Sequence, residues 1–373
     1  MYIAVKNITF VYSGNRKKLL SGKEKYARDF FYGYTEFDQK KYNLNIIEFE
    51  KPNCWLASFF TKFDSNLSKL LSLPIYFSKI LNKKNFKTLL GSNEIYLVNE
   101  GVGISTLPFL IIINLFKSNS INLFVMGLYS KNIRYSFFYP LHKLFIRLLV
   151  SQVDYLVFLG EGELKKAKKF HRNNTHKKFI FSPFLIDSEF WSINGFNLKN
   201  NKNILFVGND GNRDFKFLIE LVTSLSDFSF TIVSSDASLK ELDLKNVKLI
   251  DGDWAANKLS DEDLRKVYAS SKLCIIPLKR STQPSGQSVA LQSMSMGVPV
   301  MITDTEGFWD HKSFNDNQEL FLIKENSLEL WASKIRLVFS DEIKLDLVSK
   351  NARELINKKF SINDNLNYLK NIN

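Results

Sequence analysis

Short apolar segments alternate with helical patterns along the whole of this 373-residue chain, and that alternation limits the folds open to it. A strand buried on both faces is a continuous apolar run, and a helix between two such strands joins them in parallel. The sequence therefore predicts an α/β protein with parallel sheets. The expected strands span residues 3–12, 44–49, 94–98, 122–126, 155–159 and 178–182, and then 203–207, 228–234, 247–250, 273–277 and 298–302.

The two series of strands predict two domains. A chain of this length is too long for one compact core, and 45% hydrophobic residues suffice for two. We predict Rossmann-like, doubly wound domains at 1–190 and 203–344, joined by a polar linker at 191–202. The helical segment 345–373 is expected to pack back on the first domain. Because ligands of open parallel sheets bind beyond the carboxyl ends of the strands, a cleft between the domains is the expected site.

A turn, a helix, a glycine stop and a strand are predicted in order within residues 283–300 (Gln-Pro-Ser-Gly-Gln-Ser-Val-Ala-Leu-Gln-Ser-Met-Ser-Met-Gly-Val-Pro-Val). Gly297 suits the left-handed position that ends a helix. In the first turn, unpaired backbone N–H groups and the positive end of the helix dipole favour an anion. A plain helix cap is the alternative. The residues expected at this phosphate-binding turn are Ser285, Gly286, Gln287 and Ser288.

A second strand-to-helix junction lies in residues 206–216 (Phe-Val-Gly-Asn-Asp-Gly-Asn-Arg-Asp-Phe-Lys). Gly208 lies in its loop, and Arg213 and Lys216 fall about one helical turn apart near the expected helix start. Basic residues there oppose the helix dipole, so an anion such as a diphosphate would explain them, and Arg can grip phosphate with paired donors. Ordinary surface positions are the alternative. Two such junctions in one domain are what a shared diphosphate site requires.

The second half resembles the donor domain of GT-B glycosyltransferases, in particular the large retaining group that uses nucleotide sugars. The resemblance rests on Leu-Gln-Ser-Met-Ser-Met-Gly-Val-Pro-Val at 291–300, on the helix at 264–271 and on the loop at 303–307. The first half resembles the group by architecture alone. The resemblance implies two Rossmann-like domains facing a cleft. It also implies transfer of a sugar from a UDP- or GDP-linked donor to a hydroxyl acceptor, in surface polysaccharide or glycolipid assembly, without a metal.

The resemblance also assigns roles to residues. Arg213 and Lys216 would neutralise the departing diphosphate, and Gly22, in a weaker match, would approach it from the first domain. In the group two glutamates contact the sugar and the ribose, but this chain has Pro284 and Gln292 in their places. Gln292 can still hydrogen-bond a ribose hydroxyl, and the other donor contacts pass to Ser285, Gln287 and Ser288. Retention is the expected stereochemistry.

Several acidic residues are candidates for further roles. If the reaction inverts, Glu100 at the end of a predicted strand could deprotonate the acceptor, with Glu161 and Glu163 as rivals and a solvated carboxylate as the alternative for each. The Asp251-Gly-Asp253 sequence is of the kind that binds a metal-diphosphate in another glycosyltransferase fold. Here Asp253 is expected near the nucleotide base. We predict no metal site, and the four His residues are given no chemistry.

The basic charge of the chain lies in its first half. Residues 1–190 hold 28 Lys and Arg against 14 Asp and Glu, whereas residues 191–373 hold 23 against 24. The first half is therefore expected to face something anionic, either a lipid-linked or glycan acceptor or the membrane surface. A helix at 140–150, with Lys143 and Arg147 beside aromatic residues, suits contact with anionic lipid, although a buried helix is equally compatible. Nothing specifies nucleic-acid binding.

Two further features bear on the cellular location of the chain and on its contact with membranes. Cys54 and Cys274 lie far apart, and the longest apolar run, 107–116, is too short to span a bilayer, so a cytoplasmic protein with at most peripheral membrane contact is expected. Three alternatives to a glycosyltransferase stay open. They are a sugar-nucleotide epimerase, a phosphorylase on the same fold, and a non-catalytic subunit that lacks the glutamate pair.

Overall fold

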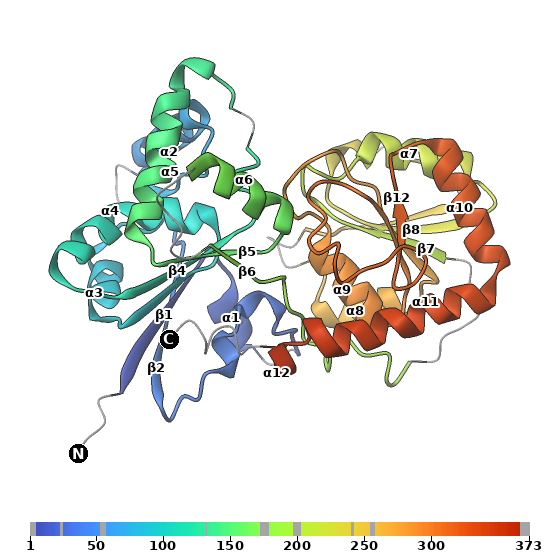
Figure 1. Ribbon diagram of the computed structural model, residues 1–373, viewed down its shortest axis with the longest axis horizontal. Helices are drawn as coiled ribbons and strands as arrows, with labels where there is room; N and C mark the ends of the chain where they lie inside the picture. Colours follow the sequence, from blue (N-terminus) through green and yellow to red (C-terminus); the bar gives the residue numbers. More distant parts are fainter. Residues whose placement is uncertain are drawn as a thin grey trace. The chain divides into compact units, whose positions relative to one another are not determined.

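Two compact units make up the chain in a computed structural model (Figure 1). The structure describes residues 5–22, 25–52, 57–131, 133–171, 179–196, 203–239, 242–253 and 258–365. Unit 1 comprises Met1–Glu24 and Phe31–Ser182, and unit 2 comprises Lys25–Phe30 and Pro183–Asn373. The units thus divide at residue 182 rather than at 190, and a short N-terminal segment belongs to the second unit.

Unit 1 contains a six-stranded parallel sheet of order β2-β1-β3-β4-β5-β6, which confirms the predicted fold class. Its inner strands are buried on both faces, as their continuous apolar sequences predict. The strand order reverses between β1 and β3. The strands are β1 (Lys6–Tyr12), β2 (Tyr42–Glu48), β3 (Glu94–Leu97), β4 (Ser120–Val125), β5 (Tyr155–Phe158) and β6 (Phe179–Phe181).

The helices of unit 1 connect these strands. Figure 1 shows α1 on one side of the sheet and α4, α5 and α6 on the other. The α4 helix is apolar around most of its circumference and is capped by Asn99, whose side chain accepts a hydrogen bond from the Val102 N–H. The helices are α1 (Arg16–Ser21), α2 (Ala57–Leu71), α3 (Lys83–Gly91), α4 (Glu100–Phe116), α5 (Tyr139–Gln152) and α6 (Glu161–His171).

Unit 2 repeats the design with a parallel sheet of order β12-β11-β10-β7-β8-β9, whose strand order reverses between β7 and β10. The three-residue strand β12 has no counterpart in the sequence prediction, because so short an apolar run between polar residues resembles a loop. The strands are β7 (Asn203–Val207), β8 (Ser229–Val233), β9 (Val247–Ile250), β10 (Leu273–Ile276), β11 (Val300–Thr303) and β12 (Phe321–Ile323).

Helices cover both faces of this second sheet. The pair α7 and α10 and the pair α9 and α11 each make contact, and Figure 1 shows the two pairs on opposite sides of the strands. Gly297 has φ 73° after α9 and ends that helix, which confirms the predicted left-handed stop. The helices are α7 (Phe215–Ser224), α8 (Asp261–Ala269), α9 (Gln287–Ser295), α10 (Leu328–Ser340), α11 (Glu342–Leu355), a π-helical turn (Ile356–Phe360) and α12 (Ile362–Asn365).

The residues predicted to form the linker begin inside unit 2. Trp191 is fully buried, and its carbonyl accepts a hydrogen bond from the Ser295 hydroxyl at 2.7 Å. Residues 197–202 lie outside the described part of the chain. The C-terminal segment also packs within unit 2 as far as it is described, since Ile186 and Phe360 are joined by a backbone hydrogen bond of 2.9 Å.

Candidate functional site

Two loops meet at the point in unit 2 where the strand order reverses. The loop after β7 and the loop after β10 are joined by a short antiparallel bridge between Arg213 and Leu278. Its hydrogen bonds run from the Asp214 N–H to the Pro277 carbonyl at 3.0 Å and from the Lys279 N–H to the Asn212 carbonyl at 2.8 Å. Carboxyl ends of strands beside such a reversal are the usual ligand site of open α/β sheets.

Arg213 is buried at this junction. Its side chain is 3% exposed, its Nη1 lies 2.9 Å from Asp210 Oδ2, and its Nε has no hydrogen-bond partner among the described residues. The Nη1 contact is an ion pair without hydrogen-bond alignment. Burial is the largest influence on the Arg213 pKa and lowers it, against the opposing charge of Asp210. A guanidinium so poorly compensated is costly to bury, and an anion would stabilise it.

Glycine at position 208 makes room for Arg213. A Cβ atom on Gly208 would stand 2.3 Å from Arg213 Nε, so any other residue there would displace the guanidinium. Gly286 lies on the other side, where an added Cβ would be 3.5 Å from Arg213 Nη1. The structure therefore brings Gly208, Arg213 and Gly286 together, as a single anion site requires.

Helix α9 begins beside the Arg213 guanidinium. Gly286 is its N-cap with φ 78°, a left-handed conformation that glycine adopts without strain, and no side chain caps the helix. The first bond of the helix runs from the Ala290 N–H to the Gly286 carbonyl at 2.9 Å, which leaves the amides of Gln287, Ser288 and Val289 outside the helical pattern. A cation and the positive end of a helix dipole thus lie side by side.

Ser285 and Gln287 flank this N-cap in different ways. Ser285 lies before the helix rather than in its first turn, and its hydroxyl accepts a hydrogen bond of 2.7 Å from the Asn212 amide. Gln287 is buried, and its Nε2 has no hydrogen-bond partner among the described residues. Ser288 is half-buried in the first turn. An unpaired buried donor in the first turn of α9 can donate to an anion bound there.

Among the described residues, neither Lys216 nor Asp253 contacts Arg213. Lys216 is the second residue of α7 and is exposed, whereas Arg213 lies before the helix and is buried. Asp253 is half-buried after β9, where its N–H donates to Asp251 at 3.1 Å. In unit 1, Gly22 caps the C-terminus of the short helix α1 and is exposed.

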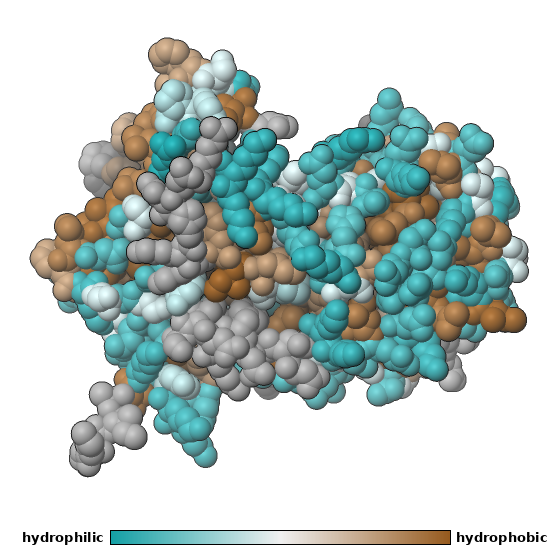
Figure 2. Space-filling model, viewed as in Figure 1, coloured by the Kyte–Doolittle hydropathy of each residue, from teal (hydrophilic) through white to brown (hydrophobic). Residues whose placement is uncertain are grey.

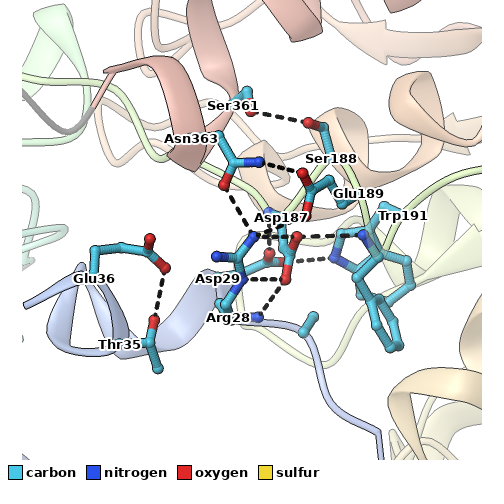
Figure 3. A network of polar contacts seen from close by, with 12 residues as sticks. Arg28, Asp29, Thr35, Glu36, Asp187, Ser188, Glu189, Trp191, Ser361 and Asn363 are labelled. Carbon is cyan, nitrogen blue, oxygen red and sulfur yellow. Dashed lines mark hydrogen bonds and ion pairs between the residues drawn. The ribbon is translucent and has the colours of Figure 1, made fainter. Parts of the chain in front are cut away.

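Gln292 takes part in a buried network of unit 2. Figure 3 shows the part of this network around Asp29, Asp187 and Trp191. Its Nε2 donates to Asp29 Oδ2 at 2.8 Å, and its Oε1 accepts from the Tyr268 hydroxyl at 3.3 Å. Asp29 also accepts hydrogen bonds from Trp191 Nε1 at 2.7 Å and from the Asp187 N–H at 2.6 Å. The amide expected to face the ribose is therefore already paired inside the protein.

Burial sets the ionisation of this network. It raises the pKa of Asp29 to about 7, although three donated hydrogen bonds oppose the rise. The adjacent Asp187 differs: burial acts on it too, but the hydrogen bond and charge of Arg28 hold its pKa below the usual value. Arg28 grips Asp187 through Nε at 2.7 Å and Nη2 at 2.9 Å. These bonds attach residues 25–30 to unit 2.

Two of the predicted carboxylates lie close together in unit 1. Glu100 begins α4 directly after β3, where the strand order reverses, and its Oε2 accepts from the Met126 N–H at 3.4 Å. Glu163 is fully buried, its Oε1 accepts from the Tyr129 N–H at 2.9 Å, and its Oε2 has no partner among the described residues. Glu161 is half-buried at the start of α6.

Both buried carboxyl groups have raised pKa values. Burial, followed by the charge of Glu100, raises the pKa of Glu163 to about 8, and burial also raises the pKa of Glu100. The charge of Lys131 opposes both shifts. Glu163 therefore holds its proton at neutral pH, and Glu100 remains the predicted base for an acceptor hydroxyl.

Some residues of the site are not apparent from sequence. Asp210 and Asn212 lie in a polar loop where any Asn or Asp is expected. Asp210 pairs with Arg213 of the same loop, whereas the bond from Asn212 to Ser285 forms only where the two loops meet. Asp29 lies 263 positions before Gln292, and no local pattern joins them. Within the described ranges, no group of three His, Cys, Asp or Glu side chains is placed to hold a metal, and no helix is long and apolar enough to cross a membrane.

Comparison with known proteins identifies a family match in the second unit and the fold of the chain. Residues 201–341 match the family model described as glycosyl transferases group 1. Solved structures show that the fold is GT-B. Anabaena HepE, in complex with UDP and glucose, is 13% identical with a TM-score of 0.63, covering 98% of each chain. Sucrose-phosphate synthase from Thermosynechococcus elongatus is 12% identical with a TM-score of 0.64, covering 95% of each chain.

A third solved structure matches over a smaller part. S. aureus TarM is 15% identical with a TM-score of 0.57, and the match covers 76% of this chain but only 55% of TarM. The chain therefore spans about half the length of that protein. Among curated protein sequences, none matches this chain.

Proposed function

We propose that this chain, which has the GT-B fold and a glycosyl transferases group 1 domain at 201–341, transfers a sugar from a nucleoside-diphosphate sugar to a hydroxyl acceptor. The observation that carries the proposal is the buried guanidinium of Arg213 beside the uncapped start of α9. A cation beside the positive end of a helix dipole is unfavourable by itself. A bound diphosphate would stabilise both of them. The UDP bound in the similar HepE structure belongs to this chemical class.

In the proposed reaction, the bond between the anomeric carbon and the diphosphate oxygen breaks while the acceptor oxygen bonds to that carbon. Negative charge grows on the leaving diphosphate, where Arg213 and the first-turn amides of α9 stabilise it. These fixed positive groups take the place of a metal in the proposal. The acceptor proton passes to the leaving phosphate if configuration is retained, which we favour, and to Glu100 if it inverts.

The acceptor is proposed to be a glycan or a lipid-linked molecule used in surface polysaccharide or glycolipid assembly. Unit 1 supports a peripheral contact with anionic membrane from the cytoplasmic side. Its helix α5 has an exposed apolar stripe, and Lys143 and Arg147 lie on the same helix. The stripe consists of Leu141, Leu144 and Leu148, preceded by Phe137, which is 85% exposed.

One observation favours a second function. The position of the ribose-binding glutamate is occupied by Gln292, whose amide is paired with Asp29 and Tyr268, and Pro284 provides no side-chain acceptor. A subunit that binds a nucleotide without transferring sugar would have the same features. Release of UDP or GDP from a donor sugar in the presence of acceptor distinguishes an enzyme from such a subunit.

The test is calorimetric titration of the full chain with UDP and with GDP, repeated with the Arg213→Ala variant. We expect one nucleotide to bind and the variant to bind it more weakly. Turnover should fall further than affinity, because the charge opposite Arg213 is largest in the transition state. Failure of the wild-type chain to bind either nucleotide would reject the proposed function.

A further inference from the structure

Unit 1 contains a cavity of about 590 Å³, within the range of small-molecule sites. It lies between α5, α6 and the loop that follows β4, and all of its lining residues belong to unit 1. The buried side chains of His142 and Ile146 contribute to its wall. Neither the donor site nor the carboxylates Glu100 and Glu163 line this cavity.

The charge of this cavity is of one sign. No Asp or Glu is among its lining residues, and within the described part of the chain none of its Lys and Arg side chains forms an ion pair. Like charges gathered around a concave surface repel one another and focus a positive potential on the space between them. The basic lining residues are Lys131, Lys143, Arg147, Lys166 and Lys169.

His171 responds to that potential from within the wall. It is half-buried and shares a hydrogen bond of 2.8 Å with the Tyr129 hydroxyl. Burial is the first cause that lowers its pKa to about 4, and the charges of Arg147 and Lys143 add to the effect. The imidazole is therefore neutral at pH 7, and its pKa is sensitive to the charges around the cavity.

The rest of the wall is apolar and aromatic. Lys143 Nζ lies 5.5 Å from the ring centre of Phe170 and 5.9 Å from that of Tyr139, so its ammonium group is held between two rings. In Figure 2 the surface over α6 is hydrophilic. A ligand that fits must combine negative charge with a body that can lie against aromatic rings.

We propose that this cavity binds a phosphate or diphosphate group of the acceptor molecule. The inference rests on the proposed function, because it gives the chemical class of the second substrate. Five cations, of which Lys131 also interacts with the carboxyls of Glu100 and Glu163, match the two to three charges of a phosphate or diphosphate ester. Arg147 can bind its oxygens with paired donors. The rings of Tyr139 and Phe170 provide a surface for the attached sugar or hydrocarbon.

Helix α6 offers a matched pair of variants for the test. Lys166 and Lys169 line the cavity, whereas Lys165 and Lys168 are exposed on the same helix and do not. Lys166→Ala with Lys169→Ala therefore removes the same net charge as Lys165→Ala with Lys168→Ala. Both double variants change only exposed side chains, and circular dichroism checks that they fold.

Pyrophosphate is the soluble probe, followed through the ring signals of His171, assigned with a His171→Gln variant. When the pH is titrated through the pKa of the ring, binding should shift the transition of those signals to higher pH, because an anion near the ring raises its pKa. The cavity variant should weaken binding about tenfold, the effect of losing charge-assisted contacts, while the control variant matches wild type. Vesicles of phosphatidylcholine with and without phosphatidic acid are the lipid probe.

Two results support the inference and identify the source of the phosphate. Pyrophosphate binding that depends on Lys166 and Lys169 indicates a soluble phosphate ester, and vesicle binding alone with the same dependence indicates a lipid headgroup. Equal losses in the two double variants, or an unchanged His171 signal with both probes, overturn it. Nucleotide titration of the same samples keeps the tests separate, since intact UDP or GDP binding leaves the donor proposal standing.

Discussion

The side chain of Arg213 occupies the space where a Cβ atom of residue 208 would lie. A Cβ added to Gly208 would be 2.3 Å from Arg213 Nε. Glycine is therefore needed at position 208 to leave room for the Arg213 side chain, and not for a special backbone conformation. It also follows β7 directly and keeps a backbone hydrogen bond of 3.1 Å to Val233. The position of the cation and the end of the strand are fixed by the same residue.

Gly208→Ala should therefore displace Arg213 and reduce nucleotide affinity by at least tenfold, with a loss of about 1–3 kcal/mol in the free energy of unfolding from overpacking. Gly211→Ala is the matched control, because an added Cβ there meets nothing within 4 Å. Calorimetry and urea unfolding measure the two effects. Equal behaviour of the two alanine variants would contradict the close contact.

Replacing Arg213 with methionine should separate stability from binding. Methionine removes a buried charge whose Nε has no partner among the described residues, so without nucleotide the melting temperature should be unchanged or higher. The stabilisation that nucleotide gives the wild type should disappear. Lys350→Met, at an exposed position of α11, is the control. A large loss of stability without nucleotide would show that Arg213 supports the fold rather than a ligand.

Glu163 predicts a pH dependence of stability. Its pKa is raised from 4.5 to about 8, so between these values the folded chain holds a proton that the unfolded chain has released. Stability should fall as the pH rises through this range. Glu163→Gln, which keeps the neutral form, should flatten the slope, whereas Glu161→Gln on the same helix should not. Urea unfolding across the range measures it, and parallel slopes in all three proteins would refute the assignment.

The contact between Gln292 and Asp29 predicts the result of introducing the glutamate that the sequence resemblance implies at position 292. Gln292→Glu would place two carboxyl groups 2.8 Å apart in a buried site. The variant should lose stability, more at pH 8 than at pH 5, because both groups cannot ionise together. Adding Asp29→Asn should recover part of the loss, as measured by a double-mutant cycle. Additive losses would mean that the two residues do not interact.

Much of the fold follows from the sequence because each buried parallel strand is a local apolar run. Leu273–Ile276, for example, is fully buried, and no distant residue is needed to recognise it. Helix ends are similarly local, and Gly297 stops α9 as predicted. β12 escaped prediction because three residues are too few to show a pattern.

Only part of the candidate site could be predicted from the sequence. Glycine and arginine at a strand-to-helix junction indicate an anion, and the structure brings Arg213 and Gly286 together. The pairing of Gln292 with Asp29 depends on chain segments far apart in sequence, which no local motif encodes. The cavity in unit 1 was likewise visible beforehand only as an excess of basic residues in the first half.

The attachment of Lys25–Phe30 to unit 2 has a consequence for dissecting the molecule. A C-terminal fragment that starts at Pro183 would lack Asp29, leaving the buried indole of Trp191 and amide of Gln292 without this acceptor. No single cut of the polypeptide can yield two intact halves. The C-terminal fragment by itself would need a synthetic peptide spanning residues 25–30 to restore that acceptor.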